Sequence, residues 1–507
     1  MDSSFSYSGM TEAKNGSTIP LRGTISFHSK YNPEREAEQF ASQYSASGEN
    51  CFFIVQGLCG GFHIQALKKR FPKSTVVAIE NTKDDIQFLR QIPTVQAVLH
   101  QNDVFVLSED EIQKRLPEIF IPAAFDSISV IALRSWENAF PAQAEAIKTQ
   151  INKTISAISA DFSVQSHFGG IWQRNILVNV KTVFSQKMIL PCFPTKKTAA
   201  VIAAGPSLDE TYAEILKKRD DFFVIATDTG YRALLRRGIT SDAVICVDAQ
   251  MISHAHFFEV APDTLCIFDI SANPATVRRI AQTNSVFFIQ TGHPLSAWVS
   301  QKTAHFLPQL TAGSGTVTVT AAAFAVHAGF ERIRFFGADF GYSRGKAYTK
   351  GSYLDDLYNT TANRLRPAES QFAHLLLRTE LKQTGTDFFT TDLLSSYGQS
   401  LAEYMKVNNF IKKADTEYIR TENVPSRGIL FPPQKTNVEN QKAYGAFASA
   451  YSAALHDAFA GSPNKKNAAF ITLLPYIAWL KRRFPQDEFE KTARLAYKKT
   501  LEYIEEL

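Results

Sequence analysis

The chain has 507 residues, too many for a single hydrophobic core, so two to four domains are expected. With 45% hydrophobic and 20% charged residues and a net charge of +5, the composition excludes an intrinsically disordered chain. Because the charge is mild and no basic stripe is visible, the composition also argues against nucleic-acid binding.

Four runs of β-branched and aromatic residues alternate with helical patterns near the N-terminus, at residues 51–56, 74–80, 103–108 and 126–133. This alternation predicts parallel strands in a Rossmann-like α/β domain over residues 1–150. A glycine-rich loop from Gly57 to Gly61 follows the first strand, and the second strand ends on Glu80. The order is that of a nucleotide-binding turn, but the spacing is G-x-x-G-G. A cofactor site and a tight turn without a ligand therefore both remain open here.

Residues 151–190 are predicted to form a helical connector that ends in a proline-containing stretch. Strand patterns then return over residues 191–400, at 199–205, 222–228, 243–248, 264–270, 285–290 and 332–340. After residue 400 the pattern becomes helical, including residues 401–419, which predicts a helical domain over 401–507 for packing or partner binding. The predicted fold class is α/β, with two Rossmann-like domains of mainly parallel sheets followed by an all-helical C-terminal domain.

Small and polar residues follow the carboxyl ends of the strands in residues 191–400. Gly205, Pro206 and Ser207 turn the first strand into a helix, where free backbone amides would suit a nucleotide phosphate, although Ser207 could instead cap that helix. The other residues of this kind are Thr227, Asp228, Asp248, Gly313, Ser314, Gly315, Gly337 and Asp339. Since open α/β sheets bind ligands at this edge, the loops predict a binding site.

The five cysteines (Cys51, Cys59, Cys192, Cys246 and Cys266) form no Cys-x-x-Cys pair and lie in apolar runs, which is typical of reduced thiols. The N-terminus is polar, and no run reaches the 18 or so apolar residues of a membrane span. These features predict a cytoplasmic protein without a membrane span.

The ordered series of motifs resembles the motility-associated factor (Maf) glycosyltransferases, whose central domain is similar to the family 42 bacterial sialyltransferases. The resemblance rests on the central loops above and on residues 13–16, 28–37, 57–61 and 172–175 with Asn179. It implies transfer of a nonulosonic acid, of the pseudaminic or legionaminic type, from its CMP-activated form to Ser or Thr of flagellin. It also implies that Gly205, Pro206 and Ser207 wrap the nucleotide and that Thr227, Asp228 and Asp248 line the pocket. Gly313, Ser314 and Gly315 would approach the donor, with Gly337 and Asp339 at the floor of the site.

By the same resemblance, Tyr342 and Tyr348 would stabilise the departing phosphate, and His374 would act as the general base. A purely structural His374 remains an alternative, and His293, His327, Asp355 or Asp356 could take its place. Because a monophosphate leaves and no Asp-x-Asp occurs in this block, no cofactor is expected, and magnesium is compatible but not required. Residues 341–370 show little helix or strand signal, which favours a lid or an acceptor groove. In this stretch Arg344, Lys346 and Lys350 could meet the donor carboxylate, or they could be solvated surface charges.

Three alternatives remain open. The central domain also resembles archaeal 6-hydroxymethylpterin diphosphokinases, in which Asp228, Asp242 and Asp248 would hold magnesium for pyrophosphate transfer. A non-catalytic nucleotide-binding factor in flagellar assembly is the second alternative, and a methyltransferase using the first glycine-rich loop is the third. Homo-oligomerisation is compatible with each of them.

Overall fold

The computed structural model describes residues 6–45, 48–185, 193, 197–302, 307–311, 315–414, 416–421 and 440–507. Gly313, Ser314 and Cys192 therefore lie outside the described residues. The chain folds into two compact units, the first formed by residues 1–167 and 477–492 and the second by residues 168–476 and 493–507. Cys51, Cys59, Cys246 and Cys266 are buried free thiols, in agreement with the sequence.

The first unit is built on a four-stranded parallel sheet in the order β6-β5-β4-β7. Its strands are β4 (Cys51–Gln56), β5 (Thr75–Glu80), β6 (Val104–Ser108) and β7 (Ser127–Ala132), which confirms the four predicted runs. A small antiparallel sheet precedes it, made of β1 (Gly9–Glu12), β2 (Thr18–Arg22) and β3 (Ile25–Ser26).

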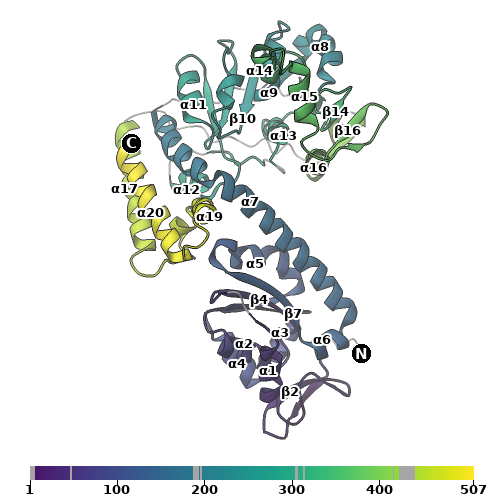
Figure 1. Ribbon diagram of the computed structural model, residues 1–507, viewed down its shortest axis with the longest axis vertical. Helices are drawn as coiled ribbons and strands as arrows, with labels where there is room; N and C mark the ends of the chain where they lie inside the picture. Colours follow the sequence, from purple (N-terminus) through teal and green to yellow (C-terminus); the bar gives the residue numbers. More distant parts are fainter. Residues whose placement is uncertain are drawn as a thin grey trace. The chain divides into compact units, whose positions relative to one another are not determined.

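Short helices alternate with these strands (Figure 1). They are α1 (Pro33–Ser42), α2 (Phe62–Arg70), α3 (Lys83–Leu89), α4 (Pro93–Leu99), α5 (Ile112–Ile119) and α6 (Arg134–Ala139). The helix α7 (Pro141–Ser185) then runs for 45 residues and passes from the first unit into the second at residues 167–168.

The glycine-rich loop after β4 is filled by groups of the protein itself. The Leu58 amide donates to Oε2 of Glu80 at 3.0 Å, and the Gly60 amide donates to Nε2 of His28 at 3.0 Å. The Gly57 and Gly61 amides donate to backbone carbonyls. Glu80 is fully buried, and burial raises the pKa of its carboxyl, although its carboxylate also accepts from Tyr7 and Trp136. These contacts favour the tight-turn interpretation over a cofactor site, because a phosphate would find these amides occupied.

The second unit is built on an eight-stranded sheet in the order β12-β11-β10-β9-β8-β13-β18-β17. Six parallel strands match the predicted runs. They are β8 (Thr198–Ile202), β9 (Phe222–Thr227), β10 (Ala243–Cys246), β11 (Leu265–Asp269), β12 (Val286–Ile289) and β13 (Arg332–Phe336). The chain moves outward from β8 to β12 and then returns to place β13 on the other side of β8. This reversal makes the gap between β8 and β13 the topological switch point of the sheet, where open α/β folds bind ligands.

Helices connect these strands, as Figure 1 shows. They are α8 (Leu208–Lys217), α9 (Asp228–Leu235), α10 (Ser253–His256), α11 (Pro274–Ile280), α12 (Pro294–Lys302) and α13 (Val317–His327). The alanine-rich α13 is buried from Thr318 to Val326 and packs against β8, β9 and β10. The parallel sheets and connecting helices confirm the predicted α/β class.

Two parts of the sequence prediction were wrong. Residues 410–420 are not helical: after α16 (Asp392–Val407) they form β17 (Phe410–Ala414) and β18 (Glu417–Arg420), an antiparallel hairpin beside β13. Asn409, with φ of 63°, makes the left-handed turn into this hairpin, and exposed lysines are typical of such edge strands.

Residues 341–370 are also more regular than expected. They contain β14 (Tyr342–Ser343), α14 (Tyr353–Thr361) and the start of α15 (Ala368–Leu376). The strand β14 joins a small antiparallel sheet with β15 (Lys382–Gln383) and β16 (Phe388–Thr390).

The end of the chain is helical, as predicted. Its helices are α17 (Asn440–Ala458), α18 (Ala468–Ile471), α19 (Leu474–Arg483) and α20 (Phe489–Glu506). In the second unit, the buried Gln173 of α7 donates to Tyr451 of α17 and Thr500 of α20. None of the helices described here combines the length and apolar character needed to cross a lipid bilayer.

Candidate active site at the carboxyl edge of the central sheet

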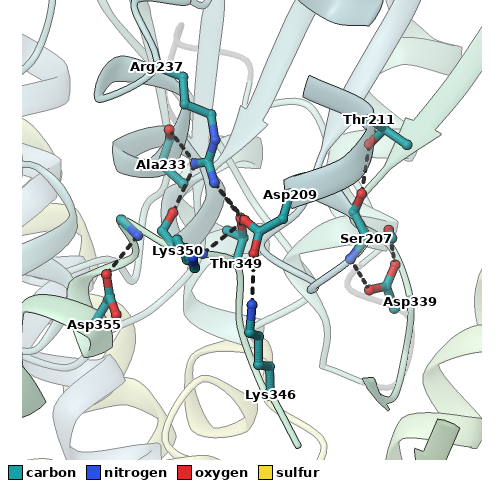
Figure 2. A network of polar contacts seen from close by, with 11 residues as sticks. Ser207, Asp209, Thr211, Ala233, Arg237, Asp339, Lys346, Thr349, Lys350 and Asp355 are labelled. Atoms are coloured by element: carbon teal, nitrogen blue, oxygen red, sulfur yellow. Dashed lines mark hydrogen bonds and ion pairs between the residues drawn. The ribbon is translucent and has the colours of Figure 1, made fainter. Parts of the chain in front are cut away.

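The loops that follow β8 and β13 are joined directly at the switch point. The Gly205 amide donates to the Gly337 carbonyl at 2.7 Å. The Ser207 amide donates to Oδ2 of Asp339 at 2.8 Å, and the Ser207 hydroxyl donates to Oδ1 of the same carboxylate. Figure 2 shows Ser207 facing Asp339 at the start of α8. The structure therefore brings together these four predicted site residues.

The two glycines are required by this close approach. A Cβ atom on Gly205 would lie 2.5 Å from the Gly337 carbonyl oxygen. Gly337 has a φ of 63°, and a Cβ there would lie 2.5 Å from the Ala203 carbonyl oxygen. Both glycines therefore allow two backbones to pack against each other.

Ser207 does not cap α8 with its side chain, because its hydroxyl donates a hydrogen bond to Asp339 instead. Burial raises the pKa of the Asp339 carboxyl, while the hydrogen bonds from Ser207 favour its charged form. A carboxylate of the protein thus occupies the Ser207 amide at the start of this helix, which is a favourable place for a negative charge.

A second carboxylate, Asp209, holds the loop that carries Tyr348 (Figure 2). Asp209 accepts from Arg237 at 2.6 Å and from the Lys350 amide at 3.1 Å, and Lys346 lies 3.5 Å away. The Thr349 hydroxyl also donates to Asp209, and the Thr349 amide donates to the Ala204 carbonyl at 2.8 Å. The loop over residues 346–350 is therefore fixed against the end of β8.

Arg344, Lys346 and Lys350, the cations that could have met the donor carboxylate, lie either beside protein carboxylates or exposed on the surface. Arg344 pairs with Glu210 at 2.9 Å, and Lys346 with Asp209, so both already face protein carboxylates. Lys350 is exposed. Of the two earlier interpretations, this arrangement favours surface and structural charges over donor recognition.

Tyr342 and Tyr348 lie half-buried after β13. Burial raises the pKa of Tyr348, and the neighbouring Tyr342 and Asp228 raise it further, against the opposing effect of Arg378. Both tyrosines and the loop after β9 are thus close enough to interact electrostatically. Because its pKa is raised, Tyr348 keeps its phenolic proton at neutral pH and can donate a hydrogen bond.

The loops after β9 and β10 add two carboxylates. Thr227 caps α9 by accepting from the Gly230 amide at 3.2 Å, and the buried Asp228 accepts from the Thr229 amide at 2.7 Å. Asp248 accepts from the Gln250 amide at 2.9 Å, and burial raises its pKa, with Asp228 adding to the effect. The two predicted pocket carboxylates therefore lie near each other.

Sequence reasoning missed two members of this neighbourhood, Tyr353 and His256. Burial raises the pKa of Tyr353 to about 12, with further contributions from Tyr348, Tyr358, Asp228 and Asp248. The ring of buried His256 packs edge-on against Tyr353, with centroids 4.4 Å apart. The nearness of Tyr353 to Tyr348, five residues earlier, was the only sequence signal for it.

Asn175 and Asn179, from the motif at residues 172–175 with Asn179, attach α7 to the central sheet. The Asn175 side-chain amide donates to the carbonyls of Ala249 and Ser271, both at 2.9 Å. Asn179 donates likewise to Ile270 and Ala272, both at 2.8 Å. The helix α7 is thereby attached to the loops after β10 and β11, and it holds the backbone beside Asp248.

The candidate bases differ in their availability. His374 is exposed on α15 and makes no hydrogen bond or ion pair with any described residue. Burial lowers the pKa of His293 to about 3, and burial also lowers that of His327, whose Nδ1 is bonded to the Ala323 carbonyl. Asp355 accepts from the Gly351 amide, and Asp356 pairs with Arg232 and Arg236.

The third predicted loop is described only at its end. Gly315 has a φ of 98°, and Thr316 caps α13 by accepting from the Thr318 amide. Within the described ranges, no three His, Cys, Asp or Glu side chains are grouped in a way that would hold a metal ion.

Comparison with known proteins gives a family model and sequence relatives that match part of the chain, and a solved structure that matches most of it. Residues 174–345 match the family model described as 6-hydroxymethylpterin diphosphokinase MptE-like. One uncharacterised protein of Treponema pallidum (strain Nichols) is 28% identical over 36% of this chain and 88% of its own length. A second from the same strain is 30% identical over 48% of this chain and 80% of its own length.

The chain is also similar to the structure of a MAf glycosyltransferase from Magnetospirillum magneticum AMB-1. The TM-score is 0.50 with 12% sequence identity, and the match covers 98% of this chain and 91% of that one. At this identity the likeness concerns the fold, and the predicted resemblance to the Maf proteins is confirmed at that level. The chain belongs to the same family as the second Treponema pallidum protein, and its fold is that of a MAf glycosyltransferase.

Proposed function

We propose that this protein is a glycosyltransferase that moves a nonulosonic acid from its CMP-activated form to a Ser or Thr hydroxyl of flagellin. The shared fold with a MAf glycosyltransferase supports transferase activity. The observation that carries the proposal is the position of Tyr348 at the switch-point edge: the amide of the next residue, Thr349, donates to the Ala204 carbonyl at the end of β8 at 2.8 Å, and Tyr342 and Asp228 both contribute to the raised pKa of Tyr348. The sugar would be of the pseudaminic or legionaminic type, and the reaction would take place in the cytoplasm.

In this mechanism the anomeric carbon loses CMP while it gains the acceptor oxygen. The transition state resembles an oxocarbenium ion, and negative charge grows on the departing phosphate. Tyr342 and Tyr348 would donate hydrogen bonds to that phosphate, a form of electrostatic stabilisation that is strong in a partly buried site. Tyr353 lies near Tyr348, and its pKa of about 12 keeps its hydroxyl protonated at neutral pH as well.

The acceptor hydroxyl must lose a proton to a general base. We assign this role to His374, because the other candidates are already engaged. Asp355 and Asp356 are bonded to the Gly351 amide and to two arginines, and burial holds the pKa of His293 at about 3. The imidazole of His374 is exposed on α15, and histidine is the side chain that most often serves as a general base.

The nucleotide would lie beside the turn formed by Gly205, Pro206 and Ser207, with Thr227, Asp228 and Asp248 along the pocket and Gly337 and Asp339 below. Its phosphate would lie outside the Gly205 and Ser207 amides, which donate to Gly337 and Asp339. Gly315 would approach the donor from the loop before α13. We propose that no metal is needed, since the leaving group is a monophosphate ester.

Calorimetric titration with CMP, and then with ATP plus magnesium, tests the proposal. CMP should bind in the presence of EDTA, and Ser207→Trp should abolish binding because the indole would displace Asp339 and fill the turn. Tyr342→Phe should bind CMP normally, since only a hydroxyl is removed. A protein that binds ATP with magnesium and ignores CMP would contradict the proposal.

A second candidate is favoured by one observation, the match of residues 174–345 to the MptE-like family model. In that case Asp228 and Asp248, which lie near each other, would hold magnesium for pyrophosphate transfer. Magnesium-dependent binding of ATP that is lost in Asp248→Asn would support this candidate.

A further inference from the structure

A helical hairpin, formed by α14, the turn after it and α15, carries an exposed surface that has no role in the proposed chemistry. We call it the hairpin surface, and it consists of Leu357, Arg364, Leu365, Arg366, Leu377 and Arg378. The helices α14 and α15, labelled in Figure 1, pack against each other through Tyr358 and Phe372, and ion pairs of Asp356 join α14 to α9.

The tip of this hairpin is a turn closed by several hydrogen bonds. The amides of Asn363 and Arg366 each donate to the carbonyl of the other residue at 3.1 Å. The Asn363 side chain also accepts from the Leu365 and Arg366 amides, at 3.0 and 2.9 Å. The turn therefore holds an Arg-Leu-Arg sequence in one backbone conformation, which lowers the entropy lost on binding.

The apolar side chains of this surface are exposed to an unusual degree. Leu365 is 95% exposed, Leu377 73% and Leu357 43%. Single exposed leucines are common on soluble proteins, so Leu365, which lies between two arginines in the turn, is the chief evidence for an interaction site. Leu365 is the most prominent of the three because it lies at the tip of the turn.

The surface also carries more positive than negative charge. Residues 357–378 contain three arginines and one acidic residue, Glu369. Arg364, Arg366 and Arg378 have no carboxylate partner among the described residues, whereas Arg232 and Arg236 of α9 both pair with Asp356 of α14. Since a guanidinium stays charged at any physiological pH, the hairpin presents permanent positive charge on both sides of an exposed leucine.

The hairpin is fixed beside the candidate site. The two ion pairs of Asp356, at 2.5 and 2.6 Å, attach α14 to α9, the helix that begins at Asp228. Within the hairpin, Tyr358 of α14 packs edge-on against Phe372 of α15, with ring centroids 4.8 Å apart. An acceptor bound to the hairpin surface would therefore be held by an element that is attached to α9, the helix that carries Asp228.

We propose that the hairpin surface docks an acidic segment of the acceptor protein that carries an apolar side chain. Carboxylates of that segment would pair with Arg364 and Arg366, and its apolar side would cover Leu365. This inference rests on the proposed function, because it assumes a protein acceptor. It places acceptor recognition on α14 and α15, outside the terminal helices α17 to α20.

Direct binding to immobilised flagellin of the source organism tests the docking without requiring catalysis. We expect Arg364→Glu/Arg366→Glu to raise the Kd by about tenfold or more, and Leu365→Ser to raise it by several-fold. Arg364→Lys/Arg366→Lys should bind nearly as well as the wild type at low salt. The matched control is Lys412→Glu/Lys413→Glu, which reverses two adjacent exposed cations on β17 and should leave the Kd within about twofold.

The outcomes separate the two proposals. If wild-type protein fails to bind flagellin, or if the Glu variants bind as well as the control, the docking proposal is wrong. If the variants lose binding but the wild type never transfers a sugar, the docking surface stands and the proposed function fails. If the wild type transfers a sugar, the Glu variants should show a raised KM for flagellin and an unchanged KM for the donor.

Discussion

The Ser207 amide and hydroxyl both donate to the carboxylate of Asp339, which joins the loops after β8 and β13 across the switch point of the central sheet. Burial raises the pKa of Asp339, so the carboxylate is held by these hydrogen bonds against a desolvation penalty. The pair fixes the start of α8, where the nucleotide is expected to bind.

This relationship predicts different effects for two substitutions of Asp339. Asp339→Leu leaves the Ser207 amide without an acceptor and should lower the free energy of unfolding by about 2 kcal/mol. Asp339→Asn should lower it by less than about 1 kcal/mol, because its amide oxygen still accepts and the Ser207 hydroxyl can rotate to accept in turn. Urea unfolding of both variants checks this, and equal losses would show that the hydrogen bonds do not matter.

The two glycines of the same junction predict a steric effect. Gly337→Ala would place a Cβ 2.5 Å from the Ala203 carbonyl oxygen at a φ of 63°, so we expect a loss of about 3 kcal/mol or more, or insoluble protein. Gly238→Ala is the matched control, since Gly238 has a φ of 69° but has open space around its Cβ position. The control should lose only about 1 kcal/mol, the cost of the left-handed backbone alone. Similar melting temperatures for the two variants would contradict the close-packing argument.

The tyrosines predict a loss of rate without a loss of binding. Tyr342→Phe and Tyr348→Phe should each lower kcat by about 10- to 1000-fold while changing the KM for the CMP-sugar little, because the hydroxyls act on charge that develops in the transition state. Tyr212→Phe is the control, because its ring packs against Arg237 and Phe retains that ring. Unchanged kcat in both test variants would remove the tyrosines from the mechanism.

The buried His63 predicts an acid sensitivity in the first unit. Burial lowers the pKa of His63 to about 3, with a further contribution from His28. The unfolded chain, with an ordinary pKa of about 6.5, therefore binds more protons between these values, and stability falls as the pH drops below about 6.5.

Between pH 7 and pH 5.5 this loss should be about 1 kcal/mol for His63. His63→Gln should remove that part of the loss, whereas the exposed His100→Gln should not. Urea midpoints measured at the two pH values test this, and an unchanged pH dependence in His63→Gln would show that His63 is not the responsible group.

The sequence predicted the strands well because most of the parallel strands are buried on both faces and form continuous apolar runs, although β7 exposes Ile128 and Val130. The hairpin of β17 and β18 was missed because Lys412, Lys413 and Glu417 obscure its alternation at the sheet edge. Similarly, α14 was missed because its Gly- and Ser-rich approach resembles a loop.

The candidate site was only partly predictable. The turns at Gly205 and Gly337 follow from strand ends, since parallel strands deliver them to one edge. The contacts of His28 and Glu80 that fill the first glycine-rich loop depend on residues brought together from separate parts of the chain. For the same reason, the contact between His256 and Tyr353 had no signal in the local sequence.

The most direct test of the central claim is the intact mass of flagellin after incubation with the protein and CMP-activated pseudaminic or legionaminic acid in EDTA. We predict that flagellin gains the mass of one or more nonulosonic acid residues, with release of an equal amount of CMP, and that Tyr348→Phe slows both together. Flagellin of unchanged mass with both donors, whether or not magnesium is restored, would contradict the proposed transfer.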